Sequence, residues 1–177
     1  MKKIFKGDGN GGFTLIELLI VMAILGVLAV VVLVAINPVQ QLARTRDAGR
    51  KSGIAQIGRA LEAYYTSHSG SYMQALSYLT TLSASGEIST PPAAISYRAG
   101  WAGTACDSGG TQQNNWCYET NAGSEAVVYT QLESDSERSK CPTAGQAAFF
   151  VWSTFDGRGG LTCVDVEAAG TTQVFID

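Results

Sequence analysis

The hydrophobic and polar positions of this chain of 177 residues change their pattern along its length. Residues 1–12 are polar and carry three lysines. Residues 18–36 form an uninterrupted apolar run, LLIVMAILGVLAVVVLVAI. Beyond residue 38 the apolar positions recur with helical spacing, and the C-terminal third contains short β-rich segments between glycine-rich turns. The pattern therefore predicts an apolar helix, an amphipathic helix and a small β-sheet.

The apolar run has the length of a membrane-spanning helix. A helix of 19 residues is roughly 28 Å long, close to the thickness of the hydrocarbon core of a bilayer. The apolar region of a cleaved secretory signal usually has about 7–15 residues and ends at a small-x-small site. This run is longer and no Ala-x-Ala pattern closes it, so we interpret it as a retained membrane segment.

Glu17 stands immediately before the apolar run. A carboxylate at mid-bilayer costs on the order of 3 kcal/mol, so it needs a partner. Cleavage of the chain after Gly12 would give Phe13 a free α-amino group, a cation one helical turn from Glu17. The amino group of a neighbouring subunit would serve equally well. Glycine suits a cleavage position because it leaves the backbone accessible.

Gly12, the following sequence FTLIE and the apolar run together resemble the class III signal of type IV pilins and type II secretion pseudopilins. The resemblance implies cleavage after Gly12 by a membrane prepilin peptidase, N-methylation of Phe13 and a role for Glu17 in docking subunits within a filament. It also implies three kinds of partner: identical or related pilin subunits, the prepilin peptidase, and an inner-membrane assembly machinery with its ATPase. The alternative is a plain signal-anchor with an incidental glutamate.

Two positions weaken the long helix. Pro38 removes a backbone hydrogen bond and clashes with the carbonyl of Val34, and Gly26 lies in the middle of the apolar run. We therefore expect flexibility between Gly26 and Pro38. A local extension, as in assembled pilins, and a simple break with the membrane helix ending at Ile36 both fit the sequence.

The segment after Pro38 predicts an amphipathic helix that ends before Gly70. Its apolar stripe is formed by Ile54, Ile57, Leu61, Tyr64 and Tyr65. One broken helix would thus run from about residue 13 to residue 67. The segments AINP, RDA and AQI are again similar to pilins. So is Gly70-Ser71-Tyr72, although Met73 stands where the family often has proline.

Residues 70–177 are expected to form a globular head. The part up to residue 125 is rich in loop-forming residues and predicts only a short helix near 72–82. The predicted strands are 126–132, 147–153 and 161–166, with an edge strand at 174–176 and a hairpin loop at 155–160. An antiparallel sheet packed on the helix gives an α+β head, the pilin fold. The expected domains are a leader (1–12), a membrane or filament-core helix (13–37), an amphipathic helix (38–69) and the head (70–177, with its sheet at 126–177).

The four cysteines predict disulfides rather than a metal site. They are Cys106, Cys117, Cys141 and Cys163. None forms a CxxC pair, and an even number beyond a membrane anchor favours an oxidising compartment. Of the three possible pairings we favour Cys106–Cys117 and Cys141–Cys163. Disulfides would place the head outside the cytoplasm, which the lysines and arginines on both sides of the apolar run leave undecided. Buried free thiols in a cytosolic domain are the alternative.

Charge excludes a general nucleic-acid-binding surface. The net charge is −3 and the pI about 5.1. Removal of the leader brings the charge to −5, because Lys2, Lys3, Lys6 and Asp8 sum to +2. Charged residues make up only 15% and hydrophobic residues 46% of the chain, which argues against disorder.

Candidate catalytic and binding residues are few. His68 is the sole histidine and is expected to lie at a helix end. The sequence DGRGG at 156–160 lacks the Lys-Ser/Thr of a P-loop. Acidic residues at 133, 135 and 137 fit a solvated turn better than a calcium site. The tryptophans are expected as core or loop anchors: Trp101, Trp116 and Trp152. The sequence thus predicts no enzyme activity, no cofactor and no metal.

Three functions remain. The first is a structural subunit of a type IV pilus-like filament. The second is a pseudopilin of a type II secretion system. The third is a membrane-anchored binding module with an incidental pilin-like leader. For the first two, the protein would be a single-pass membrane protein before assembly and a periplasmic or extracellular filament afterwards.

Overall fold

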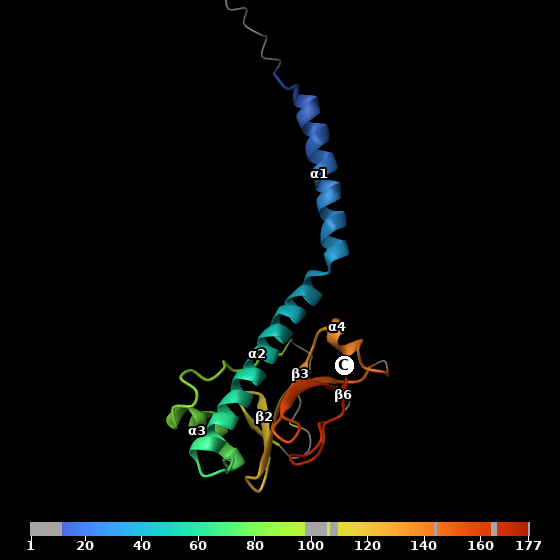
Figure 1. Cartoon of the computed structure of the whole chain (residues 1–177). Helices are drawn as coiled ribbons and strands as arrows, with labels where there is room; N and C mark the ends of the chain where they lie inside the picture. Colours follow the sequence, from blue (N-terminus) through green and yellow to red (C-terminus); the bar gives the residue numbers. More distant parts are fainter. Residues whose placement is uncertain (1–11, 98–105, 107–109, 144, 164–165, 177) are drawn as a thin grey trace, which may run out of the picture. The chain divides into compact units, whose positions relative to one another are not determined.

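A computed structural model describes residues 12–97, 106, 110–143, 145–163 and 166–176. The chain divides into two compact units, residues 1–41 and 42–177. The first contains helix α1 (Leu15–Ile36) and the first turn of helix α2 (Pro38–Ser67). The second contains the rest of α2 and the whole sheet (Figure 1). The α+β class and the pilin-like order of elements predicted from the sequence are therefore confirmed.

The head is built on one antiparallel sheet in which every strand pairs with its neighbours in the chain. Its order is β1-β2-β3-β4-β5-β6. The strands are β1 (Thr111–Gln113), β2 (Trp116–Asn121), β3 (Glu125–Leu132), β4 (Ala148–Ser153), β5 (Arg158–Cys163) and β6 (Phe175–Ile176). Short turns join β1 to β2, β2 to β3 and β4 to β5, which agrees with the glycine and asparagine residues between these strands. Longer connections join β3 to β4 and β5 to β6.

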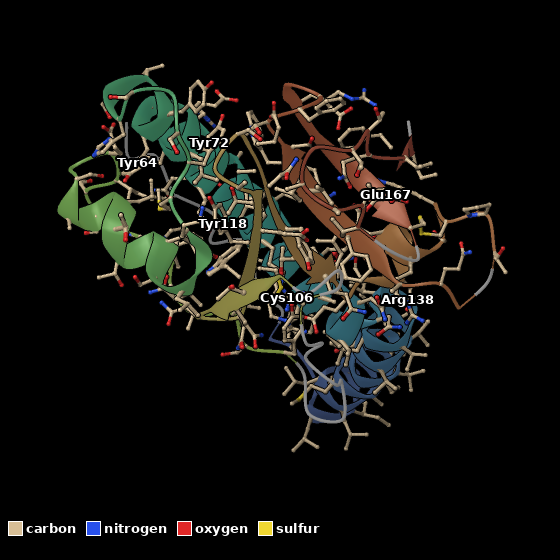
Figure 2. All side chains as sticks on the ribbon, turned by 90° about the horizontal axis from the view of Figure 1, so that it is seen from below. Tyr64, Tyr72, Cys106, Tyr118, Arg138 and Glu167 are labelled. Atoms are coloured by element: carbon tan, nitrogen blue, oxygen red, sulfur yellow. A yellow bond between two sulfur atoms is a disulfide. The ribbon has the colours of Figure 1, made fainter. Side chains whose placement is uncertain are left out.

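Alternate residues of the central strands pack on opposite faces of the sheet, as the two-residue period of a strand requires. Tyr118 and Val128 face the stripe of α2 that includes Ile54, Ile57 and Leu61. Tyr129 and Val151 face the opposite side, where Val166, Ala169 and Phe175 cover the sheet. Strand β3 is consequently buried on both faces. Helix α2 covers one of these faces. Figure 2 labels Tyr72 and Tyr118, which both belong to the face covered by α2.

Strands β1 and β2 lie in the region predicted to be loop. Their connection consists of Asn114 and Asn115, both with positive φ (54° and 65°). Two such residues are the signature of a tight type I′ hairpin turn, which asparagine adopts readily. The Asn-Asn pair between Gln113 and Trp116 was thus a hairpin signal that the low apolar content of the region obscured.

The remaining boundaries differ by a few residues from the prediction. The hairpin turn between β4 and β5 spans residues 154–157, and Gly159 and Gly160 belong to β5. The rings of Trp152 and Phe175 lie over these glycines and take the space of a Cβ. That strand was predicted to end at Val166, which is not in a strand, and residues 164–165 lie outside the described residues. The short helix predicted at 72–82 is a 3₁₀ turn (η1, Ala75–Ser77) followed by α3 (Tyr78–Ala84). A further helical turn, α4, covers Asp135–Arg138.

Candidate assembly and processing site

Helix α1 begins with a capping box formed by Thr14 and Glu17. The Thr14 hydroxyl accepts the backbone N–H of Glu17 at 3.2 Å. The Glu17 carboxylate in turn accepts the Thr14 N–H at 2.9 Å and its hydroxyl at 2.7 Å. This reciprocal arrangement satisfies backbone donors that the first helical turn leaves open. The helix therefore starts at Leu15, two residues later than predicted, and Glu17 lies on its first turn.

Gly12 and Phe13 precede the helix in exposed, non-helical backbone. A Cβ at Gly12 would meet nothing within 4 Å, and the φ of Gly12 is not in the left-handed region. Neither the backbone conformation nor the packing around residue 12 therefore requires glycine. Phe13 is 85% exposed. Both residues of the expected cleavage position are thus exposed.

Helix α1 exposes its apolar side chains in every direction. Among the residues that the structure describes, this is the helix that is long and apolar enough to cross a membrane. None of its residues is buried, and Leu15 at its start is 82% exposed. A helix that is hydrophobic all round must be covered by lipid or by other helices. Together with the prepilin-type signal, this indicates membrane anchoring before assembly.

The long helix is interrupted at Asn37, where α1 ends. Asn37 adopts a left-handed conformation (φ 46°, ψ 78°), which asparagine tolerates better than most residues. Pro38 follows as the first residue of α2, a position where its missing N–H costs nothing. Gly26 remains inside a continuous helix, and a Cβ there would meet nothing within 4 Å. The described break thus falls at Asn37 and Pro38, next to the predicted end of the membrane helix.

A buried ion-pair cluster holds α2 to the end of β3. The Asp47 carboxylate accepts the backbone N–H groups of Glu133 (3.0 Å) and Ser134 (2.8 Å). Arg50 donates to Asp47 at 2.9 Å and to Glu133 at 3.0 Å. Arg46 forms a further ion pair with Glu133. Asp47, Arg50 and Glu133 are each less than 5% exposed, so their charges compensate each other away from water.

The prediction that Glu133 belongs to a solvated acidic turn is wrong, because this side chain turns into the head. The sequence signal was the helical spacing of Asp47 and Arg50, which places both on the buried face of α2. Asp135 is exposed, and Glu137 pairs with Lys51 (2.8 Å) and Lys140 (2.9 Å). The three acidic residues therefore do not converge on one point. Within the described part of the chain there is no group of three potential metal ligands.

The electrostatics of Glu137 are set by its two lysines. Partial burial of the carboxylate tends to raise its pKa, but the hydrogen bonds and charges of Lys51 and Lys140 outweigh this effect and lower the pKa below the ordinary 4.5. Glu119 on β2 shows the opposite behaviour: burial raises its pKa, and the N–H of Ala169 opposes this only in part.

Two disulfides cross-link the head. Cys106 is bonded to Cys117 on β2, and Cys141 is bonded to Cys163 on β5. These are the pairs that we favoured from the sequence. The second bond fastens the segment after α4 to the sheet. It lies in an apolar cluster with Leu132.

His68, Trp116 and Trp152 each contact other residues of the head. His68 stacks on Tyr64 at the C-terminal end of α2, with ring centroids 3.7 Å apart. Trp116 is buried, and its indole N–H donates to the Ala93 carbonyl. Trp152 is half-buried and donates to Glu62. Trp101 lies outside the described residues.

Comparison with known proteins gives a match at the N-terminus. Residues 8–33 match the family model of the prokaryotic N-terminal methylation motif. No curated protein and no solved structure matches the chain. The motif includes Gly12, Phe13 and Glu17, and it continues through most of α1. The chain therefore carries the class III prepilin signal of type IV pilins and pseudopilins.

Proposed function

We propose that the protein is a structural subunit of a type IV pilus-like filament. In this proposal a prepilin peptidase cleaves the chain after Gly12, Phe13 is N-methylated, and subunits polymerise through α1 with the aid of an inner-membrane assembly machinery and its ATPase. The observation that carries the proposal is the methylation motif leading into a helix whose apolar side chains are all exposed. The head then remains outside the cytoplasm, in agreement with its two disulfides.

Glu17 is the proposed docking residue. In the isolated chain its carboxylate is hydrogen-bonded to Thr14, which reduces the cost of placing it at the membrane boundary. Cleavage after Gly12 would leave the Thr14 N–H in place and add the α-amino group of Phe13 as a nearby cation. Glu17 would thus keep its cap and gain an ionic partner, in its own chain or in a neighbouring subunit.

The first experiment is the intact mass, without reduction, of protein sheared from the surface of native cells. We expect a chain without residues 1–12, with one additional methyl group and four fewer hydrogens than the fully reduced polypeptide. The same processed chain found only in the membrane fraction would favour a pseudopilin of a type II secretion system. An uncleaved chain would contradict the proposal and return the protein to the class of membrane-anchored binding modules.

Two substitutions of Glu17 separate its charge from its capping role. Glu17→Gln keeps a capping acceptor and loses the charge, whereas Glu17→Val loses both. We expect both variants to insert in the membrane and to yield far fewer surface filaments. Filaments at the wild-type level from Glu17→Gln would contradict a docking role for the charge.

A further inference from the structure

The first turns of α2 bury little side-chain surface. The helix begins at Pro38, directly after the break at Asn37. Within residues 38–46, the side chain of Ala43 is buried, those of Gln40 and Arg46 are half-buried, and the other six are exposed. Packing against the head therefore contributes little to holding this stretch in a helix.

The same stretch has little helical stability of its own. Isolated helices shorter than about 12–15 residues are marginal in water, because each further residue adds little free energy. Pro38 supplies no N–H, and the N–H groups of Gln40 and Gln41 both donate to the carbonyl of Asn37. Unwinding from this end breaks local hydrogen bonds that water can replace, so its cost is small.

The buried ion-pair cluster is the point where α2 becomes fixed to several segments at once. Arg50 donates to Asp47 and to Glu133. It also donates to the backbone carbonyls of Gln131 and Ser96, each at 3.3 Å. The helix, the end of β3 and the segment before β1 thus meet at one guanidinium group. Unwinding of the helix here would leave buried charges without partners, which costs far more than the loss of local hydrogen bonds.

We propose that this cluster divides α2 into two parts with different freedom. Residues 38–46, which we call the neck, open and close locally, whereas the helix from Asp47 onward stays fixed to the sheet. As a helix the nine residues of the neck are about 14 Å long, and fully extended they reach at most about 31 Å. The connection between α1 and the head can therefore lengthen by up to about 17 Å without any change in the head.

This inference goes beyond the proposed function. It concerns a segment that follows Pro38, whereas the flexibility expected from the sequence precedes that residue. The neck has the same role in a pilus subunit, in a pseudopilin and in a membrane-anchored binding module, because it depends only on contacts within one chain. The failure of one proposal therefore leaves the other intact.

The test is amide hydrogen exchange of the full chain in detergent micelles, followed residue by residue along α2. When the neck opens, the first four N–H groups of the remaining helix also lose their partners, so the boundary of fast exchange should lie near residue 50. We expect the amides of residues 42–50 to exchange at least about a hundredfold faster than those of Ile54 and Ile57, whose opening requires the cluster to break. Equal protection of the two groups in the wild type would overturn the proposal.

Substitution of Asp47 tests whether the cluster sets the position of this boundary. In Asp47→Asn the next fixed point is the buried stripe that starts at Ile54. Fast exchange should therefore spread to the amides of Ile54 and Ile57, whereas that of Leu61 should stay slow. Arg46→Gln changes the partly exposed side of the cluster and should raise the same rates to a smaller extent. It keeps the test decisive if Asp47→Asn does not fold.

The matched control is Val151→Ala, which removes buried methyl groups from the face of the sheet away from α2. A general loss of stability accelerates the slow amides of α2 and of the sheet by the same factor, so the boundary should remain near residue 50. An unchanged boundary in both cluster variants would overturn the proposal. A shift of the boundary in Val151→Ala as large as in Asp47→Asn would overturn it as well, because the position would then follow overall stability.

Discussion

Gly53 of α2 lies directly against the indole ring of Trp116 of β2. A Cβ at residue 53 would come within 3.0 Å of three atoms of this ring. Gly58 has the same relationship to Trp152 of β4, whose ring occupies the space of a Cβ. The two glycines thus allow the helix to approach the two tryptophans of the sheet, and the absence of a side chain at these positions determines how closely α2 packs.

We predict that Gly53→Ala destabilises the head by up to about 2 kcal/mol, the difference between an overpacking cost of about 1–3 kcal/mol and a gain of about 1 kcal/mol in helix propensity. The methyl group displaces the Trp116 ring, and this cost exceeds the gain of about 1 kcal/mol in helix propensity. The matched control is Gly49→Ala on the exposed face of the same helix, where a Cβ meets nothing within 4 Å. This control should be as stable as the wild type or more so. Denaturant unfolding in detergent, followed by tryptophan fluorescence, measures both; equal stabilities of the two variants would contradict the packing argument.

Asp47 is predicted to be the most sensitive charged residue of the head. Asp47→Asn removes an acceptor from the amides of Glu133 and Ser134 and leaves the buried Arg50 without one of its two carboxylates. Breaking a buried ion pair on one side costs about 3–5 kcal/mol. Asp135→Asn is the control, because this carboxylate is 70% exposed and lies 3.9 Å from Arg138. The control should cost less than about 1 kcal/mol. The same unfolding measurement gives the two costs. If Asp47→Asn costs as little stability as the control, the buried ion-pair cluster contributes little to the stability of the head.

The elements that depend on local sequence periodicity were predictable. The apolar run predicted α1, and the stripe through Ile54, Ile57 and Leu61 predicted the buried face of α2. The alternation and turn signals located β3, β4 and β5 to within a few residues. Each of these features has its physical cause within a window of a few residues.

The features that depend on contacts between distant segments were not predictable. Glu133 looked like part of an exposed acidic turn because its partners, Asp47 and Arg50, lie more than 80 residues earlier. Gly160 looked like part of a turn because its cover, Phe175, comes from the next strand. Of the candidate assembly site, the order of Gly12, Phe13 and Glu17 is visible in the sequence. The Thr14 cap is a local feature that the sequence analysis missed, although Thr14 and Glu17 have the spacing of a capping box.

The disulfide between Cys141 and Cys163 should stabilise the head measurably. It closes a loop with a sequence separation of 22 residues. Replacement of both cysteines by alanine should therefore cost about 3 kcal/mol, through the larger freedom of the unfolded chain. The same replacement of Cys106 and Cys117, with a separation of 11, should cost about 0.6 kcal/mol less, because the loop is half as long. Denaturant midpoints of the two variants measure the costs; no loss of stability in either would contradict this account.

Glu137 and Glu119, two carboxylates of the head with shifted pKa values, should respond to pH with opposite signs. The folded pKa of Glu137 is lowered by Lys51 and Lys140, so its ionised form stabilises the head above the unfolded value of about 4.5. This contribution is lost as the pH falls through the lower, folded pKa. Glu137→Gln should therefore be less stable than the wild type at neutral pH, and the difference should disappear in acid. The effect is expected to stay below about 1 kcal/mol, because the group is partly solvated.

Glu119→Gln is the internal comparison for that measurement. The pKa of Glu119 is raised by burial, and one of its oxygens is buried with no hydrogen-bond partner. Ionisation of Glu119 thus opposes folding, and stability falls as the pH rises through 4.5 and the higher, folded pKa. Its replacement by glutamine should stabilise the head at neutral pH, because it removes the buried charge. In acid Glu119 is itself uncharged, so the replacement should leave the charge of the head unchanged. Unfolding free energies from pH 3 to pH 7 should therefore move apart for the two variants, one below and one above the wild type. Parallel curves would contradict the opposite surroundings of these two carboxylates.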